Sequence, residues 1–478
     1  MNKIIKFLTI PVLLLIMAGC TQDILEDINV NKNNPLDVPS HLLITDAMTK
    51  TAFSVTGSDF AFYASVYVEH NVGIYNQMYN AEIRSGEPSL ATTYNNTWGS
   101  AYENLYNLKI IINKTSEGGL EEGNYHTLGI AQILSAYNLA ILTDLMGDVP
   151  YEEALQPGVI FQPKLDKQED IYGEVFRLLD EAIANLGKET LAAELGSQDF
   201  IYKGDVAKWA QFAYGLKARY TARLALRNDG KWADVIAFAN QSFASADDEA
   251  KFVYDGSTTN SPFQTFFKDR DYFGASTSLH NKLVDRGDPR DDVFFIPYPG
   301  LDDINFAPNG NPSQVQGFYG ISGIMSLVAP TYLLSYHEIL FLKAEAQVRM
   351  ENFGEAETTL VAAVEAAFAK VEVGMELDST YREVVKAQFN AAQLKEVMTQ
   401  KYFAFFESEA VEAYNDIRRL KAMGDDVITL ANPLNNTKFP LRFTYGADDV
   451  TTNLNIAAAY GNGQYVYSEN VWWAGGTR

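Results

Sequence analysis

The chain has 478 residues, a net charge of −24 and a single cysteine. This excess of acidic residues argues against nucleic acid or an anionic membrane surface as a partner. One cysteine excludes an internal disulfide, so packing alone must hold the fold together. The 27 tyrosines and 28 phenylalanines are more than a core usually needs, which suggests a binding surface rich in tyrosine.

The first residues have the features of an export signal. Lys3 and Lys6 precede a 12-residue apolar stretch that is too short to cross a bilayer as a helix. The small residues directly before Cys20 complete what resembles a bacterial lipobox, in which the cysteine is acylated and becomes the first residue. We therefore expect a signal peptide at 1–19, a lipid on Cys20 and a tether at 20–35. The alternative is an ordinary secretory signal with a chance cysteine.

Most of the remaining chain has helical periodicity. Between residues 128 and 142 the polar side chains recur every third position, which is typical of an interior helix. Asp205 is placed to cap a helix in which large apolar side chains recur every three or four residues. Four further segments repeat this spacing: 171–186, 333–348, 356–371 and 394–406. The sequence predicts a mainly α protein with its helical scaffold at 36–255 and 330–424.

One pair of predicted helices has the spacing of a tetratricopeptide unit. Its small and large packing positions are Leu340, Ala344, Ala356, Leu360 and Ala363, in the order found in such helix–turn–helix repeats. Any alanine-rich helical hairpin satisfies part of this pattern. It nevertheless explains why helices follow one another here without strands between them, so we predict a tetratricopeptide-like scaffold.

Two stretches lack helical periodicity. Residues 256–330 hold seven of the 16 prolines, together with eight glycines and scattered aromatic residues. Because a structureless loop of this length is uncommon inside a compact domain, we expect an irregular, loop-rich lobe with a few short elements. The segment 425–478 is rich in Asn, Gly and Tyr and is also predicted to be irregular. Loops on a rigid scaffold commonly carry binding sites, so we predict one domain, 36–478, with a ligand-binding lobe.

Enzyme motifs are missing from the sequence. There is no Gly-x-Ser-x-Gly, His-Glu-x-x-His, phosphate-binding glycine loop or Cys-x-x-Cys. A retaining glycosidase needs only two carboxylates about 5 Å apart, which no inventory of acidic residues can exclude. The five histidines are scattered, and His337 lies in a packed helix beside Glu338, as expected of a structural residue. We predict no catalysis, no cofactor and no metal.

Three features each have a structural and a functional interpretation. Trp98 could form a sugar platform, but it shares one helical face with Tyr102, which favours core packing. Asp288, Asp291 and Asp292 could hold calcium, but they lack the alternating spacing of an EF-hand loop, which favours a turn. Three arginines are expected to tie the C-terminal segment to the scaffold through ion pairs: Arg418, Arg419 and Arg442.

Several motifs, in chain order, resemble those of SusD/RagB-family lipoproteins. They are DLMGDVPYEEA at 144–154, QEDIY at 168–172, KW at 208–209 with LKAR at 216–219, DPR at 288–290, YHEILFLKAEA at 336–346, TQKY at 399–402 with EAYNDIRR at 412–419, PLRFTY at 440–445 with Asn453 and Asn455, and WW at 472–473. Because they follow a lipobox and cover nearly the whole mature chain, the chain is identified as a member of that family.

The resemblance implies a function. SusD-like lipoproteins lie on the outer face of the cell outer membrane and bind an oligomeric nutrient, usually a glycan. The resemblance also implies a partner, a SusC-like TonB-dependent transporter that the lipoprotein covers like a lid, and it implies no catalysis. The alternative is a helical-repeat surface adaptor that binds protein or peptide.

The predicted ligand contacts are Tyr75, Tyr79, Tyr272, Phe273 and Tyr319. They come from stretches in which members of the family differ, lack helical or strand periodicity, and lie beside residues that favour exposed turns. Tyrosine offers a flat apolar face and a hydroxyl with few rotamers to freeze. We expect one shallow aromatic arc that faces the transporter mouth. For each residue the alternative is that it fills the core of the lobe.

Overall fold

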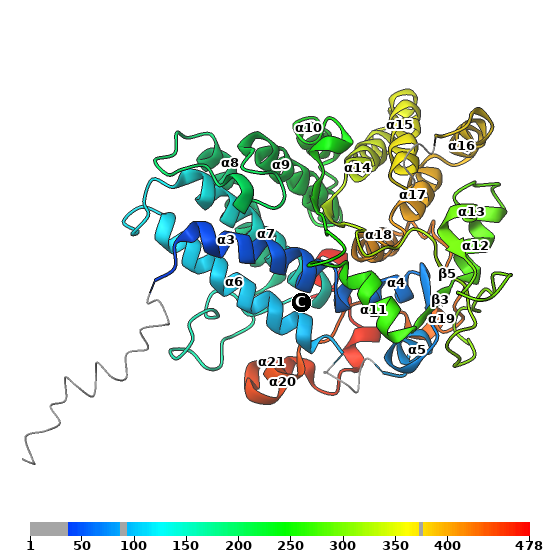
Figure 1. The fold of residues 1–478 in the computed structure, drawn as a ribbon, viewed down its shortest axis with the longest axis horizontal. Helices are drawn as coiled ribbons and strands as arrows, with labels where there is room; N and C mark the ends of the chain where they lie inside the picture. The colour runs from blue at the N-terminus through cyan, green and yellow to red at the C-terminus, as the bar shows by residue number, and fades with distance from the viewer. Residues whose placement is uncertain (1–36, 87–92, 372–375) are drawn as a thin grey trace, which may run out of the picture.

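The structure is a computed structural model that describes residues 37–86, 93–371 and 376–478 (Figure 1). The predicted signal peptide, Cys20 and the tether lie outside the described residues. Helices dominate the described part of the chain: α3 (Ser40–Lys50), α4 (Asp59–Tyr67), α5 (Asn76–Glu82), α6 (Asn95–Thr115), α7 (Tyr125–Met146), α8 (Gln168–Leu186), α9 (Val206–Arg223), α10 (Trp232–Ala239), α11 (Pro262–Arg270), α12 (Thr277–Val284), α13 (Asp291–Phe294), α14 (Tyr336–Arg349), α15 (Phe353–Val371), α16 (Ser379–Ala391), α17 (Gln393–Ala404), α18 (Ala410–Met423), α19 (Asn435–Lys438), α20 (Ala447–Thr452) and α21 (Leu454–Tyr460).

The strands are short and far apart in the sequence. Three antiparallel pairs occur among the described residues: β1 (Asn71–Gly73) with β3 (Phe273–Ala275), β2 (Ala250–Phe252) with β6 (Thr331–Leu334), and β4 (Phe295–Ile296) with β5 (Ile321–Ser322). The prediction of a mainly α, tetratricopeptide-like fold is therefore confirmed.

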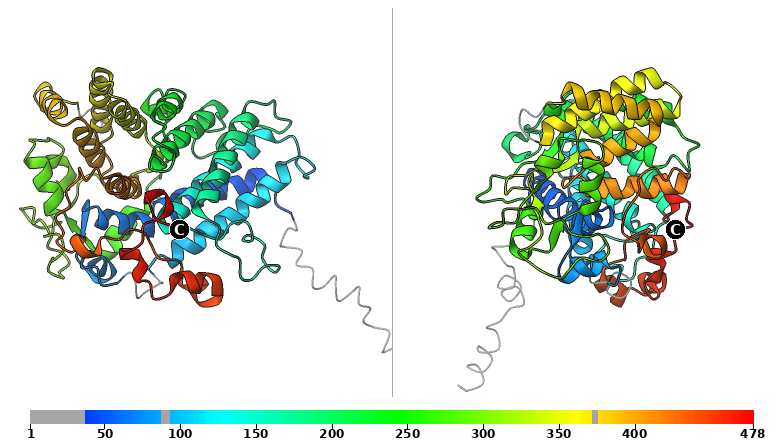
Figure 2. Two further views of the ribbon diagram at one scale, coloured as in Figure 1. Left: turned by 180° about the vertical axis from the view of Figure 1, so that it is seen from behind. Right: turned by 90° about the vertical axis from the view of Figure 1, so that its right-hand side faces the viewer.

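Consecutive helices pack against each other to form the scaffold. The pairs are α6 with α7, α7 with α8, α9 with α10, α14 with α15, and α16 with α17. In Figure 1 the helices α8, α9, α10, α14, α15 and α16 follow one another along the upper side of the molecule, and both views of Figure 2 show the C-terminal segment (red) below them. Asp205 caps α9, as predicted, because its carboxylate accepts hydrogen bonds from the N–H groups of Ala207 and Lys208.

The predicted tetratricopeptide unit corresponds to α14 and α15. Ala344, Ala356, Leu360 and Ala363 are buried between the two helices and their neighbours, while Leu340 is half-buried. The alanines allow the helices to approach closely, and the leucine fills the space beside them. The spacing in the sequence therefore identified the packing positions of this helical pair.

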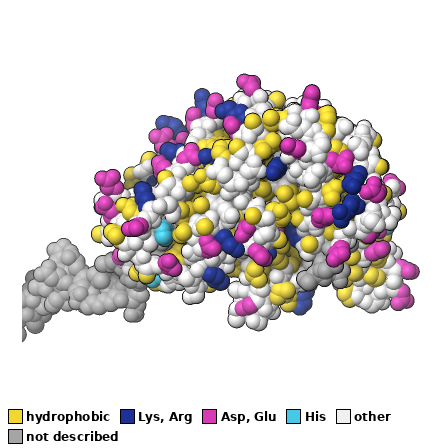
Figure 3. Space-filling view, turned by 90° about the horizontal axis from the view of Figure 1, so that it is seen from above, with side chains coloured by type: hydrophobic (Ala, Val, Ile, Leu, Met, Phe, Trp, Pro, Cys, Tyr) yellow, Lys and Arg dark blue, Asp and Glu magenta, His cyan; other side chains and the backbone are white. Residues whose placement is uncertain are grey.

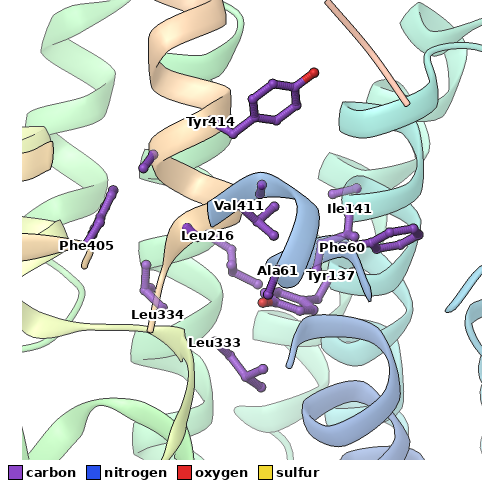
Figure 4. Close-up of a cluster of buried hydrophobic side chains, with 14 of the residues drawn as sticks. Phe60, Ala61, Tyr137, Ile141, Leu216, Leu333, Leu334, Phe405, Val411 and Tyr414 are labelled. Carbon is purple, nitrogen blue, oxygen red and sulfur yellow. The ribbon is translucent and has the colours of Figure 1, made fainter. Parts of the chain in front are cut away.

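The core lies where the first and second halves of the chain meet. Figure 4 shows Tyr137 of α7, Leu216 of α9 and Val411 of α18 directed toward one another, beside residues of α4 and β6. These side chains are buried from solvent, as are most of their neighbours. Burying such apolar surface supplies the main driving force for folding, which this chain needs because it has no internal disulfide.

Helix α7 runs through this core. It is the one described helix long and apolar enough to cross a membrane, yet it is buried inside the protein. Its polar stripe is satisfied internally: Asn138 donates to the Thr51 hydroxyl over 2.8 Å, and Gln132 donates to Glu181 over 2.9 Å. The prediction of an interior helix with a thin polar stripe is confirmed.

The C-terminal segment is attached to the scaffold by arginines, but not in the way we expected. Arg418 donates to the backbone carbonyls of Asp144 (2.8 Å) and Leu441 (3.0 Å), and Arg442 donates to the carbonyl of Met146. Arg419 instead pairs with Glu345 inside the scaffold, where its Nη1 and Nη2 each donate to a carboxylate oxygen over 2.7 Å. The expectation of three ion pairs to the segment is therefore wrong, because two of the arginines cap carbonyls at helix ends.

Two further structural interpretations are confirmed. Trp98 is buried, and its indole N–H donates to Asp449 over 2.5 Å, so it is a core residue that contacts the C-terminal segment. His337 is also buried, with Nε2 placed 2.9 Å from Glu409. Burial lowers the pKa of His337.

Charged side chains of both signs share the surface. On the face in Figure 3, acidic and basic groups alternate with apolar patches, so the negative charge of the chain is not concentrated on that face.

Candidate ligand-binding surface

Strands β1 and β3 bring together two stretches that are about two hundred residues apart in the sequence. Asn71 pairs with Ala275 and Gly73 with Phe273, and the N–H of Ile74 extends the pairing by donating to the carbonyl of Tyr272 over 2.8 Å. This register places the residues that follow β1 directly beside those that precede β3. Members of both predicted site stretches therefore meet at one edge of the lobe.

Tyr75 and Tyr272 form an aromatic pair at this edge. Their ring centroids are 5.7 Å apart, with an interplanar angle of 37°, and the Asn76 amide donates to the Tyr272 hydroxyl over 3.0 Å. Tyr75 is 37% exposed, whereas Tyr272 is only 8% exposed. The pair therefore presents the accessible ring of Tyr75 to solvent, and the buried ring of Tyr272 supports it from the protein side.

The other three predicted contacts are placed differently. Tyr79 is half-buried on α5. Phe273 is 1% exposed and stacks on Phe263, with ring centroids 5.4 Å apart. Tyr319 is 5% exposed, and its hydroxyl accepts a hydrogen bond from the N–H of Ser313 over 3.0 Å.

This burial corrects the expectation of a shallow arc formed by all five rings. Phe273 lies on β3, and its side chain packs in a cluster with Phe62, Phe263 and Phe266. Burying the apolar surface of this ring is more favourable than exposing it to water. Tyr319 belongs to a small separate core with Val72 and Ile74. The structure thus joins Tyr75 to Tyr272 at the surface and puts Phe273 and Tyr319 beneath it.

A loop of the lobe extends the surface beyond Tyr272. Asp271 has a left-handed conformation (φ 50°), and its carboxylate accepts a hydrogen bond from the N–H of Gly317 over 2.7 Å. The ring of Tyr298 lies against Gly317, and the next residue, Phe318, is 45% exposed. Burial raises the pKa of Asp271, although its hydrogen bonds from Gly317 and Tyr298 oppose that shift.

We call the residues Tyr75, Tyr272, Tyr298 and Phe318 the aromatic edge. Tyr298 and Phe318 were not among the predicted contacts. Phe318 stands next to the predicted Tyr319, and the glycine before it marks the exposed turn, so the sequence carried a local clue. Nothing in the sequence near Tyr298 shows that it contacts the loop around Gly317.

A buried carboxylate fixes the elements that surround this edge. Glu82 accepts hydrogen bonds from the N–H groups of Gly73 (3.2 Å) and Gly310 (2.5 Å) and from the Asn432 amide (3.2 Å). Burial raises the pKa of Glu82 to about 7. One side chain thereby joins β1, the lobe and the C-terminal segment, which holds the edge in place.

The aspartates of the lobe are held in a hydrogen-bonded turn. Asp288 accepts hydrogen bonds from the backbone N–H (3.0 Å) and from Nε (3.0 Å) and Nη2 (2.6 Å) of Arg290, and Asp291 contacts His280 at 2.9 Å. Throughout residues 37–86, 93–371 and 376–478, no three His, Cys, Asp or Glu side chains are grouped to hold a metal ion. The interpretation as a capped turn is confirmed.

Comparison with known proteins gives the family. A family model described as "Starch-binding associating with outer membrane" matches residues 32–446. The chain is also 43% identical to a SusD/RagB family protein from Bacteroides thetaiotaomicron, whose crystal structure matches this one with a TM-score of 0.87. The alignment covers 92% of this chain and 100% of that one. This chain belongs to the SusD/RagB family.

More distant SusD-like structures share the fold. A chitin-binding protein is 24% identical, with a TM-score of 0.72, and the alignment covers 91% of this chain and 100% of that one. A chitin-binding SusD homolog from Flavobacterium johnsoniae is 20% identical, with a TM-score of 0.72, over 91% and 98% of the two chains. The comparison with curated proteins found no match. The SusD/RagB family consists of non-catalytic binding proteins associated with the outer membrane.

Proposed function

We propose that this SusD/RagB protein is a surface-exposed lipoprotein that binds an oligomeric nutrient of the glycan class and delivers it to a SusC-like TonB-dependent transporter. Membership of a family described as starch-binding and associated with the outer membrane supports this function, as does the similarity to two chitin-binding proteins. The predicted lipid on Cys20 would tether the protein to the membrane. Binding of this kind needs no cofactor.

The aromatic edge is the observation that carries the proposal. A pyranose ring presents apolar C–H groups on its faces, and an exposed aromatic ring is a suitable platform for them. Tyr75 and Phe318 supply accessible rings, while the side chains of Asn76 and Asp271 supply polar groups close by. We propose Tyr75, Tyr79, Tyr272 and Phe318 as ligand contacts, with Phe273 and Tyr319 supporting them from beneath.

Alanine substitutions distinguish side chains that contact the ligand from side chains that only support the fold beneath them. Tyr75→Ala and Phe318→Ala are each expected to weaken glycan binding by about 0.5–1.5 kcal/mol, the contribution of one aromatic contact, with an unchanged melting temperature. The measurement is calorimetric titration against maltooligosaccharides and chitooligosaccharides. Phe353→Ala is the matched control, because Phe353 on α15 is 43% exposed and lies outside the aromatic edge. Unchanged affinity in both edge variants, for a glycan that the wild type binds, would contradict this site.

Binding to the transporter is tested by co-purification. We expect gentle detergent extraction of native membranes to recover a TonB-dependent barrel in nearly equal amount with this lipoprotein. The contact should be formed chiefly by the helical-repeat face, since such stacks provide large partner surfaces. A second outer-membrane complex in the same extract serves as the control. Recovery of the lipoprotein alone, while that complex stays intact, would favour the adaptor function instead.

A further inference from the structure

We propose that this protein has a second binding site, which takes the carboxylate of an acidic sugar, in a pocket between α12 and α17. The pocket has a volume of about 210 Å³. Helices α12 and α17 lie on the right-hand side of Figure 1, and Arg286, two residues after the end of α12, donates to Glu396 of α17 over 2.5 Å. The pocket is lined by Lys282, Asp285, Arg286, Lys395, Thr399 and the segment around Ile428. It contains no residue of the aromatic edge.

Lys282 is a half-buried cation of the pocket. Its ammonium donates to the hydroxyl of Ser278 and lies 3.9 Å from a carboxylate oxygen of Glu69. That carboxylate already accepts the N–H groups of Ala431 (2.7 Å) and Asn432 (2.6 Å), so its charge is largely engaged elsewhere. Burial lowers the pKa of Lys282, although Glu69 opposes the shift. A ligand anion in the pocket would stabilise the charged form of this lysine.

Two more cations face the same space from either side. Arg286 gives one bond to Glu396, while its buried Nε has no hydrogen-bond partner among the described residues. Lys395, one residue before Glu396, is exposed and has no ion pair within the part of the chain that the structure describes. Three cations and one carboxylate, that of the exposed Asp285, line the pocket itself, while Glu396 and Glu69 neutralise part of the charge of Arg286 and Lys282 from behind the lining. This is the reverse of the balance of the whole chain, whose net charge is −24.

The rest of the lining suits a sugar better than a bare ion. Tyr402, Phe403, Val427 and Ile428 form an apolar floor, in which the two aromatic side chains are almost fully buried. Thr399 on the α17 side and Thr429 opposite offer hydroxyl groups for sugar hydroxyls. A carboxylate held by cations, with an attached ring on an apolar floor, satisfies both parts of the pocket.

Titration with sodium glucuronate tests this site. The mature lipoprotein in detergent is expected to bind glucuronate at constant ionic strength, glucose should not bind there, and inorganic sulfate should displace glucuronate. Lys395→Ala and Lys282→Met should each weaken glucuronate binding about tenfold, because each removes a charge-assisted contact. Lys395 is exposed, so its variant keeps the test valid even if the variant of the half-buried Lys282 is unstable.

Two controls distinguish this site from other surfaces. Lys386→Ala removes a cation of α16 that pairs with Glu383 at 3.2 Å, and it should leave glucuronate affinity unchanged. Tyr75→Ala should also leave it unchanged, which separates this site from the aromatic edge. The proposal is overturned if the wild type does not bind glucuronate, if glucose binds equally well, or if Lys395→Ala retains full affinity.

Discussion

Replacing Arg290 with alanine is expected to lower the free energy of unfolding by about 3–5 kcal/mol. Arg290 and Asp288 are both buried and are joined by bonds of 3.0 and 2.6 Å, and Arg290 also donates to Gln400 over 2.7 Å. The guanidinium lies 4.6 Å from the ring of Phe368, which its loss would leave unpacked. The substitution strands the Asp288 carboxylate in the interior, where desolvation is costly. Chemical denaturation monitored by circular dichroism measures the effect.

Arg382→Ala is the matched control for this prediction. Arg382 pairs with Glu365 at 2.7 Å, but both side chains are more than one third exposed, so its loss should cost about 0–1 kcal/mol. An equal effect in the two variants would contradict the importance of burial at Arg290.

The loss should also depend on pH. Burial alone would raise the pKa of Asp288, but Arg290 holds it below its usual value, so the stability it contributes is present at neutral pH and is lost as the pH falls. In Arg290→Ala the unpaired, buried carboxyl should have a raised pKa, so the variant is least stable at neutral pH. The difference between the two proteins should therefore shrink toward acid. A constant difference from pH 3 to 7 would mean that lost packing, and not charge, dominates.

Helices and their packing faces were largely predictable from the sequence. The periodic apolar residues of α8, α9 and α15 specify a buried face locally, and Asp205 marks the start of α9. Long-range pairing carries no such local pattern. The antiparallel contact of β1 with β3 decides that Tyr75 meets Tyr272, and only the folded chain brings these segments together.

The candidate site was predictable only in part, for the same reason. Tyrosine and phenylalanine serve equally well in a core and on a platform, so the identity of Phe273 could not reveal that it stacks on Phe263. Arg418 and Arg442 show a related limit, because their cationic character suggested carboxylate partners. Their actual partners are backbone carbonyls whose position depends on where α7 ends.

Changing Cys20 to serine should release nearly all of the protein from the membrane fraction. Each buried methylene of an acyl chain contributes about 0.8 kcal/mol of membrane affinity, and serine provides no thiol for the lipid transfer. Among the described residues, the helix long and apolar enough to cross a membrane is α7, and it is buried in the core. The fold should be unaffected, since no disulfide can be lost. Cell fractionation and labelling with radioactive palmitate measure the effect.

Thr21→Ser is the control for the anchor, because it makes a similarly small change directly after the cysteine and keeps the thiol. It should remain labelled and membrane-bound, with the same melting temperature as Cys20→Ser. A strongly acidic protein is repelled by anionic headgroups, so outside a complex with the transporter only the lipid holds it at the membrane surface. If wild-type protein is unlabelled, or if Cys20→Ser stays in the membrane fraction at high salt, then the lipid is not the anchor.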